Sequence, residues 1–270
     1  MPVASSQRWG LVLLKVGSPE FMVSLADSQA LFAKYQMAIH NEPPEQCNPR
    51  TFYEFLVDSP LEPWHPRDGL PQGYGSFHQQ YWMDGRLIAV GVIDILPRCV
   101  SSVYFYYDPE LGQLSLGTYA SLRHASCIST VVCFREICLT RSLHGHSSVL
   151  QYYYMGFYIH TCPKMRYKAS YSPSFLLCPE VYTWHPVNEC KIRLDQNKYC
   201  RFNDDPNARD KDGDVVLNDV LVLSHQRAMS YCIYVAMDRM DRNVDDAEEV
   251  MQYARLVGMK CARRMFLVRT

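Results

Sequence analysis

The side chains with the clearest chemical potential lie in one stretch, residues 151–179, which reads QYYYMGFYIHTCPKMRYKASYSPSFLLCP. Four of its first eight residues are tyrosine, a side chain whose apolar ring and hydrogen-bonding tip suit the wall of a binding site. A basic cluster of Lys164, Arg166 and Lys168 follows. Alternating cations with Tyr167 between them are suited to hold an anionic group near a ring face. The simpler interpretation is a buried strand followed by a solvated basic turn.

A second chemical feature is the carboxylate of Asp94, which lies within the apolar run VIDIL. Burying a carboxylate without a partner is costly, so this residue either has a function or forms a structural ion pair with an arginine. A desolvated carboxylate with a raised pKa could also accept a proton. The sequence is compatible with each of these roles.

These side chains need a scaffold of strands and helices. Apolar residues at helical spacing predict a helix over 27–40, and a proline-rich surface loop covers 59–72. Asp84-Gly85 between two strand-like runs is a strong hairpin signal. Three consecutive antiparallel strands are predicted, over 75–83, 87–96 and 100–107.

Further elements follow in the second half of the chain. Ser115-Leu116-Gly117 opens a helix after a strand, and the free N–H groups of such a turn can hold a phosphate, although an ordinary capped helix fits equally well. A strand is predicted over Tyr152–His160 and a helical turn over 163–168. The aspartate-rich segment 203–214 lacks calcium-loop spacing and is interpreted as a solvated loop. Residues 245–258 form an amphipathic helix that ends at a glycine.

Composition limits the classes of function. The net charge of the 270 residues is −1, so a nucleic-acid contact would have to use local patches. Eleven cysteines without a CxxC motif or ligand spacing indicate a reduced cytoplasmic or nuclear protein without a metal site. No stretch approaches the roughly 20 apolar residues of a membrane span, and residues 10–14 are too short for a signal peptide.

Several blocks of sequence, in a fixed order, resemble one known family. They are Tyr35–His40, Asp84–Pro97, Ser101–Pro109, Tyr153–His160, Cys162–Lys168, Lys198–Asn203 and Gln252–Gly258. Over roughly residues 30–123 and 135–270 the chain resembles the eukaryotic arginyl-tRNA–protein transferases. The resemblance implies an α+β fold of the acyl-CoA N-acyltransferase (GNAT) type, with a mostly antiparallel twisted sheet flanked by helices. It assigns this domain to residues 27–270 and leaves 1–26 as a divergent, disordered N-terminus.

The resemblance also implies an activity and its partners. Such an aminoacyltransferase moves arginine from arginyl-tRNA to the N-terminal amine of proteins that begin with Asp, Glu or oxidised Cys. This arginylation marks them for ubiquitin-dependent degradation, the N-degron pathway. Charged tRNA is the co-substrate, and no further cofactor, metal or membrane is expected.

Roles for individual residues follow from the chemistry that this reaction needs and from the residue types at each position. Asp94 is the candidate catalytic residue, either as the carboxylate for the arginine guanidinium or as the proton acceptor. Lys164, Arg166 and Lys168 are candidates for the acidic side chain of the acceptor protein or for tRNA phosphate. Other substrate-binding candidates are Tyr153 and Tyr154 on the tyrosine-rich strand, Tyr104 and Tyr106 for stacking the terminal adenine or merely packing the sheet, Gln80 on the hairpin, and Gly117. His78 is interpreted as a satisfied polar residue and not as a base.

Two departures from the family affect the expected activity. Family members carry an N-terminal cysteine cluster for an iron–sulfur or other metal centre, and no cysteine precedes Cys47 here. Residues 124–135 form an insert that, if helical, would rotate the following residues by about 120°, and its β-branched residues oppose a helix. An alternative function is therefore a catalytically impaired variant that acts as a binding or regulatory module. A CoA-dependent acetyltransferase fits less well, because only Gln113–Gly117 approaches the required glycine motif.

Overall fold

The structure is a computed structural model that describes residues 8–114, 139–140, 143–238 and 246–269. The chain divides into two compact units, which differs from the single domain expected over 27–270. The first unit comprises Met1–Ile159 and Lys164–Tyr171, and the second comprises His160–Pro163 and Ser172–Thr270. Each has its own hydrophobic core.

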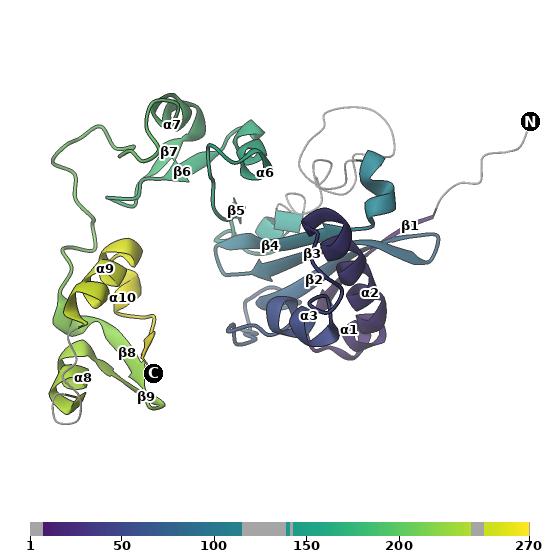
Figure 1. Cartoon of the computed structure of the whole chain (residues 1–270), viewed down its shortest axis with the longest axis horizontal. Helices are drawn as coiled ribbons and strands as arrows, with labels where there is room; N and C mark the ends of the chain where they lie inside the picture. The colour runs from purple at the N-terminus through teal and green to yellow at the C-terminus, as the bar shows by residue number, and fades with distance from the viewer. Residues whose placement is uncertain (1–7, 115–138, 141–142, 239–245, 270) are drawn as a thin grey trace, which may run out of the picture. The chain divides into compact units, whose positions relative to one another are not determined.

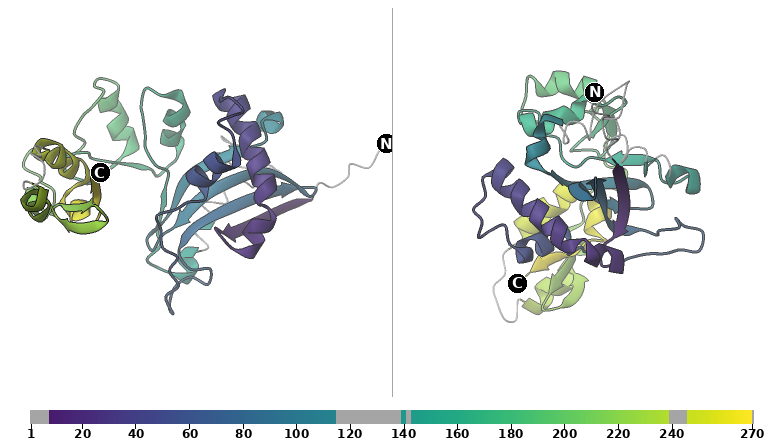
Figure 2. Two further views of the ribbon diagram at one scale, coloured as in Figure 1. Left: turned by 60° about the horizontal axis from the view of Figure 1, so that its bottom comes forward. Right: turned by 90° about the vertical axis from the view of Figure 1, so that its right-hand side faces the viewer.

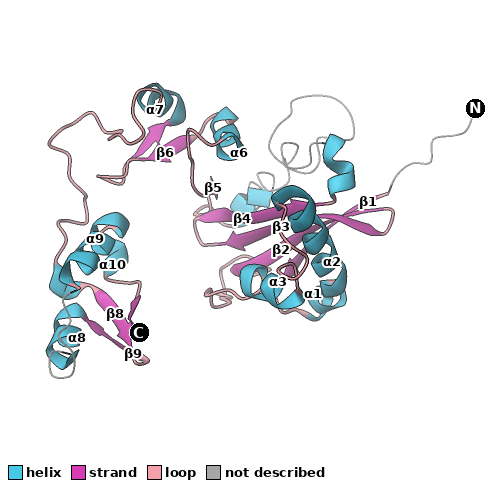
Figure 3. Cartoon of the chain, in the orientation of Figure 1, coloured by secondary structure: helices cyan, strands magenta, loops and turns pink. Residues whose placement is uncertain are grey.

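A five-stranded sheet forms the centre of the first unit (Figure 1). Its strands, in the order in which they lie side by side, are β1 (Trp9–Lys15), β2 (Gly75–Met83), β3 (Arg86–Ile95), β4 (Cys99–Tyr107) and β5 (Tyr152–Tyr154). Strands β1 to β4 pair antiparallel, whereas β5 pairs parallel with β4. Figure 3 shows this mostly antiparallel sheet beside its helices, which confirms the predicted α+β class.

Strand β1 corrects the expectation of a disordered N-terminus over 1–26. It pairs with β2 along its whole length, and helix α1 (Pro19–Val23) follows it. The expectation is therefore wrong for residues 9–23. The family blocks begin later in the sequence, so the resemblance gave no signal for this strand.

The β2–β3 hairpin turns at the predicted Asp84-Gly85. Both residues have positive φ, at 50° and 80°, as a two-residue type I′ turn requires. A glycine meets this requirement without strain. The three predicted consecutive strands are thus confirmed.

Helices α1, α2 and α3 share a core cluster with β3, and Figure 2 shows the purple helices on one face of the sheet. α1 begins at Ser18, whose side chain accepts a hydrogen bond from Phe21 N, and α3 (Pro49–Leu56) begins at Asn48 in the same way. Between them lies α2 (Leu25–Tyr35), which continues into a π-helix over Gln36–His40. This arrangement confirms the helix predicted over 27–40.

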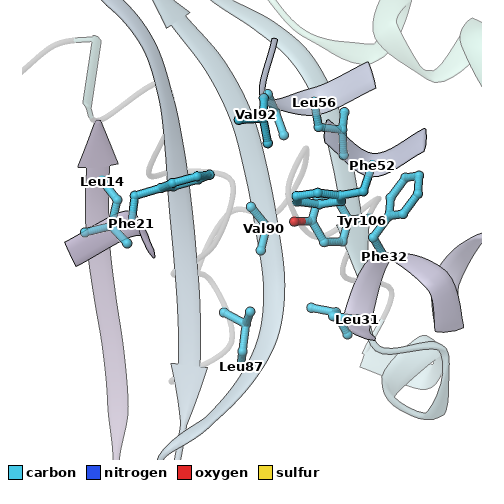
Figure 4. Close-up of a cluster of buried hydrophobic side chains, with 11 residues drawn as sticks. Leu14, Phe21, Leu31, Phe32, Phe52, Leu56, Leu87, Val90, Val92 and Tyr106 are labelled. Carbon is cyan, nitrogen blue, oxygen red and sulfur yellow. The ribbon is translucent and has the colours of Figure 1, made fainter. Parts of the chain in front are cut away.

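The core on this face is aromatic and aliphatic. Figure 4 shows the ring of Tyr106 beside those of Phe32 and Phe52, at centroid distances of 5.7 and 6.4 Å from them. Val90 and Val92 of β3 belong to the same cluster. Ile93 and Ile95 belong to a cluster on the opposite face, because successive strand residues alternate between faces.

Shorter elements complete the first unit. They are the 3-10 helices over Pro109–Leu114 and Tyr167–Ser170 and most of α6 (Pro163–Arg166). The first residue of α6, Pro163, is assigned to the second unit. The helical turn predicted over 163–168 is confirmed. The strand predicted over Tyr152–His160 is wrong in length, because the ladder with β4 covers only Tyr152–Tyr154 and Gly156 adopts φ +76°. The helix expected from Ser115, with Gly117, and the insert 124–135 lie outside the described residues.

The second unit holds two small sheets and four helices among its described residues. The first group is β6 (Phe175–Leu177), β7 (Trp184–Pro186) and α7 (Val187–Leu194). The second group is a 3-10 turn (Leu217–Asp219), β8 (Leu221–Ser224), β9 (Arg227–Ser230), α8 (Tyr231–Asp238), α9 (Ala247–Val257), α10 (Met259–Ala262) and β10 (Leu267–Arg269). The solvated loop over 203–214 and the helix that stops at Gly258 are confirmed. Within the described residues, no helix has both the length and the apolar character to cross a membrane.

Candidate functional site

A row of polar side chains crosses four adjacent strands of the first unit. Strand register pairs Ser76 of β2 with Asp94 of β3, Asp94 with Ser101 of β4, and Ser101 with Tyr154 of β5. Asp94 follows Val92 by two positions, so the row lies on the face that α1, α2 and α3 cover in part. Neighbouring strands are about 4.8 Å apart, which places the Cα atoms of Asp94 and Tyr154 about 10 Å apart.

Two serines hold the Asp94 carboxylate in place. The Ser76 hydroxyl donates to Asp94 Oδ1 at 2.6 Å. Ser59 Oγ lies 2.7 Å from Ser76 Oγ, and Leu61 N donates to Ser59 Oγ at 3.2 Å. The loop after α3 is therefore connected to the carboxylate through a short hydrogen-bond chain.

Asp94 is half-buried, and its charge is not balanced by a cation in the part of the chain that the structure describes. Burial raises the pKa of its carboxyl group, while the hydrogen bond from Ser76 lowers it. The pKa of the neighbouring Cys99 thiol is raised by burial and by the charge of Asp94. A structural ion pair with a described arginine is thus absent. The carboxylate keeps acceptor sites for an incoming cationic ligand.

The cationic side chains of the candidate site follow β5 in sequence. Lys168 Nζ donates to the carbonyl oxygen of Phe157 at 2.6 Å, and burial lowers the pKa of this amine. A β-carbon on Gly156 would lie 3.8 Å from the same nitrogen, so the lysine head group is held against the turn that follows Tyr154. Arg166 is exposed. The backbone of Lys164 belongs to α6, and its side chain lies outside what the structure describes.

The π-helical turn supplies a third group of polar side chains. The Tyr104 hydroxyl donates to Gln36 Oε1 at 2.8 Å and lies 3.2 Å from His40 Nε2. Gln36 Nε2 in turn donates to Glu42 Oε1 at 3.0 Å. Burial, together with nearby Tyr107 and Tyr167, raises the pKa of Tyr35 to about 12. The contacts with Gln36 and His40 fix the Tyr104 hydroxyl in place. π-helical turns occur frequently at functional sites.

Two of the predicted substrate-binding residues are part of the core. Tyr106 has no exposed surface, so it packs the sheet and cannot stack an adenine. Gln80 is buried and donates to Ser24 Oγ at 2.8 Å and Ser28 Oγ at 3.1 Å. It ties the sheet to the helices and does not reach a ligand. Both predictions are wrong, because strand alternation turns these positions toward the helices.

The remaining predicted residues divide between the two faces of the sheet. Tyr153 packs against the core on the face opposite Asp94, whereas Tyr154 shares the face of Asp94 and is exposed. His78 is buried, with Nε2 2.9 Å from the Leu56 carbonyl oxygen, which confirms it as a core residue.

The sequence alone did not point to Ser59, Ser76 and Ser101, since a serine gives no signal until register places it beside a carboxylate.

The fold and the site define an α+β domain built around a half-buried carboxylate. A model of the family described as "Arginine-tRNA-protein transferase, C terminus" matches residues 27–178, a range that includes Ser76, Asp94, Ser101, Tyr154 and Lys168. The chain belongs to this family.

Individual relatives agree with the family match. The chain is 47% identical to arginyl-tRNA–protein transferase 1 of Drosophila melanogaster over 268 residues, which make up 98% of this chain and 52% of that protein. It is 46% identical over 175 residues to arginyl-tRNA–protein transferase 2 of Arabidopsis thaliana, covering 63% of this chain and 27% of the relative. Aspartate/glutamate leucyltransferase of Pseudoalteromonas atlantica is 24% identical over 169 residues, 59% of this chain and 66% of the relative. The chain thus spans about half the length of the Drosophila protein.

Proposed function

We propose that the first unit carries the site that transfers arginine from arginyl-tRNA to the N-terminal amine of a protein. The observation that supports this most directly is Asp94, a half-buried carboxylate with one serine donor and no cationic partner among the described residues. A planar guanidinium binds such a carboxylate through two parallel hydrogen bonds. The names of the relatives, which are arginyl-tRNA–protein transferases, agree with arginine as the ligand.

The reaction we propose is the aminolysis of an ester. The neutral α-amine of the acceptor attacks the carbonyl carbon that joins arginine to the tRNA ribose, an amide bond forms, and the ribose oxygen leaves with a proton. The ester is already activated, so holding both reactants in position supplies much of the acceleration. Asp94 positions the arginine side chain, and charged tRNA serves as the co-substrate without a further cofactor.

The acceptor specificity we propose is for acidic N-termini: Asp, Glu or oxidised Cys. Lys168 has no carboxylate partner in the described ranges, and its head group is held beside the turn after Tyr154. A cation there would bind an acidic side chain on the far side of the row from Asp94. Arginylation of such proteins would mark them for degradation.

The acyltransferase relationship is also part of this proposal. The parallel pairing of β4 with β5, after four antiparallel strands, supports a GNAT-type arrangement in which the two substrates approach the sheet at this edge. The ester of the charged tRNA would lie at this edge.

Direct assay of transfer tests the proposal. The chain is incubated with arginyl-tRNA labelled in the arginine and with a peptide that begins with Asp, after circular dichroism has shown that it is folded. Asp94→Asn should lower transfer at limiting arginyl-tRNA by about 13- to 150-fold, the equivalent of the 1.5–3 kcal/mol of a charged hydrogen bond. The matched control is Asp58→Asn, an exposed carboxylate of the same unit. Equal rates for Asp94→Asn and the wild type would reject the assigned role.

A second candidate is a catalytically impaired binding module of the same family. The observation that favours it is the insert 124–135, whose β-branched residues Ile128, Thr130, Val131 and Val132 oppose the helix expected there. If the folded chain transfers no arginine, but the form without residues 124–135 does, this second candidate is selected. If both forms transfer arginine, it is rejected.

A further inference from the structure

Three aromatic rings are exposed on and just beyond the edge strand β5. The exposed fractions of Tyr152, Tyr154 and Phe157 are 60%, 42% and 80%. Tyr152 and Tyr154 are two positions apart, so both side chains lie on the face of the sheet that carries Asp94. A cluster of exposed rings next to a candidate site indicates a surface that binds a ligand or a partner macromolecule.

The spacing of the two tyrosines suits a nucleobase. Residues two apart on a strand are separated by about 6.6 Å, at about 3.3 Å per residue. Stacked bases are about 3.4 Å apart, so the interval between the two strand positions matches the width that one base needs for stacking on both sides.

The sequence around these rings is positive only. No aspartate or glutamate occurs between Glu136 and Glu180, whereas that interval contains Arg141, Lys164, Arg166 and Lys168. In a chain of net charge −1, this is a local excess of cations of the kind that binds phosphates.

Arg98 adds a cation from another part of the chain. Its carbonyl oxygen accepts hydrogen bonds from Gln151 N at 3.0 Å and Tyr152 N at 3.2 Å, which places the residue beside the start of β5. The side chains of Arg98 and Arg166 are both exposed. Neither forms an ion pair with any carboxylate of the described segments, so both are available for an anionic ligand.

We infer that Tyr152 and Tyr154 bind the single-stranded 3′ end of a tRNA by stacking one base between their rings. Phe157 extends the stacking surface, and Arg98 and Arg166 contact the phosphates. Aromatic rings next to backbone-binding cations are the two elements of single-strand recognition. This inference rests on the proposed function for the identity of the ligand. It places the terminal nucleotide on the same face as Asp94, about 10 Å from it at the Cα atoms of the row, within reach of an arginyl group on the terminal ribose.

Fluorescence of an uncharged RNA minihelix tests the inference without any transfer reaction. The probe ends in a single-stranded ACCA with 2-aminopurine in place of the last adenine, and the protein is the full chain. Stacking should quench the probe. Tyr152→Leu and Tyr154→Leu should each weaken binding by about 5- to 150-fold, since a base–ring stack is worth about 1–3 kcal/mol. The matched control is Tyr53→Leu on α3, whose ring is also exposed (52%) and should not matter.

Salt dependence separates the cations from the rings. If Arg98 and Arg166 contact two phosphates, log K should fall with log salt with a slope of about −1.4, and Arg98→Gln should reduce the magnitude of that slope by about 0.7. Binding without quenching, or equal weakening by Tyr53→Leu, would overturn the inference even in a chain that transfers arginine. Conversely, quenching that depends on Tyr152 and Tyr154 would support it even if the chain transfers none, so the two proposals fail separately.

Discussion

His78 should make the stability of the first unit depend on pH. Its imidazole is buried between Phe21 and Phe52, with ring centroids at 4.9 and 6.3 Å. Burial lowers the pKa of His78 from 6.5 to about 4, although the hydrogen bond with the Leu56 carbonyl partly opposes this. The folded protein therefore keeps the ring neutral, whereas the unfolded chain binds a proton below about pH 6.5.

The sign and size of the effect follow from this difference. Between pH 6.5 and 4 the unfolded state binds more protons than the folded state, so stability falls as pH is lowered through that window. A depression from 6.5 to about 4 corresponds to about 3 kcal/mol, at 1.36 kcal/mol per pKa unit. The contribution is present in full above pH 6.5.

Urea unfolding followed by tryptophan fluorescence at pH 7.5 and pH 4.5 measures this dependence. His78→Gln removes the titration but keeps a donor for the Leu56 carbonyl, so its loss of stability between the two pH values should be smaller than that of the wild type by about 2–3 kcal/mol. His146→Gln, an exposed histidine of the same unit, is the control. If wild type and His78→Gln lose stability equally, the assigned burial of a neutral ring is refuted.

Two further perturbations test the scaffold of the site. Asp108→Asn should destabilise the first unit by about 1.5–3 kcal/mol in urea titrations, because the buried Asp108 carboxylate contacts Arg86 and lies 2.8 Å from Lys34 Nζ. The control Asp58→Asn should leave the free energy of unfolding nearly unchanged. Equal losses of stability in the two variants would contradict the ion-pair role of Asp108. Tyr104→Phe should lower the free energy of unfolding by about 1 kcal/mol. A double-mutant cycle with Gln36→Ala should show coupling, because the two side chains share a 2.8 Å hydrogen bond. Strictly additive losses of stability would refute the hydrogen-bond network.

Local signals in the sequence were sufficient for most elements of the first unit. Asp84-Gly85 fixed the hairpin because positive φ at both positions is a local requirement. Asp94 stood out because a charge within an apolar strand is unusual whatever surrounds it. Tyr106 and Gln80 were misassigned for the opposite reason. Their roles depend on which face the helices cover, and that face is set by contacts with Phe32, Ser24 and Ser28, which are distant in sequence.

The parallel strand β5 could not be predicted in its register. It lies next to β4 although Tyr154 follows Ser101 by more than fifty residues in sequence, and a parallel pair has no connecting turn that would fix the alignment. This alignment decides that Tyr154 continues the polar row beside Ser101, whereas Ser59 joins the site through the loop after α3. Residue type alone therefore pointed to the carboxylate and to the cations, but not to the surface between them.

One irregularity in β4 explains how the same strand serves both the core and the site. The pairing of β3 with β4 shifts between Val92 and Ile93, which pair with Tyr104 and Ser102, so Val103 is an extra residue. Without this bulge, strict alternation from Tyr104 would turn Val100 toward Asp94 and Ser101 into the opposite core. With it, Tyr104 and Tyr106 pack under the helices, Val100 stays buried on the other face, and Ser101 continues the polar row. The position of Ser101 in the candidate site is thus a consequence of one inserted residue, as expected for bulges beside functional sites.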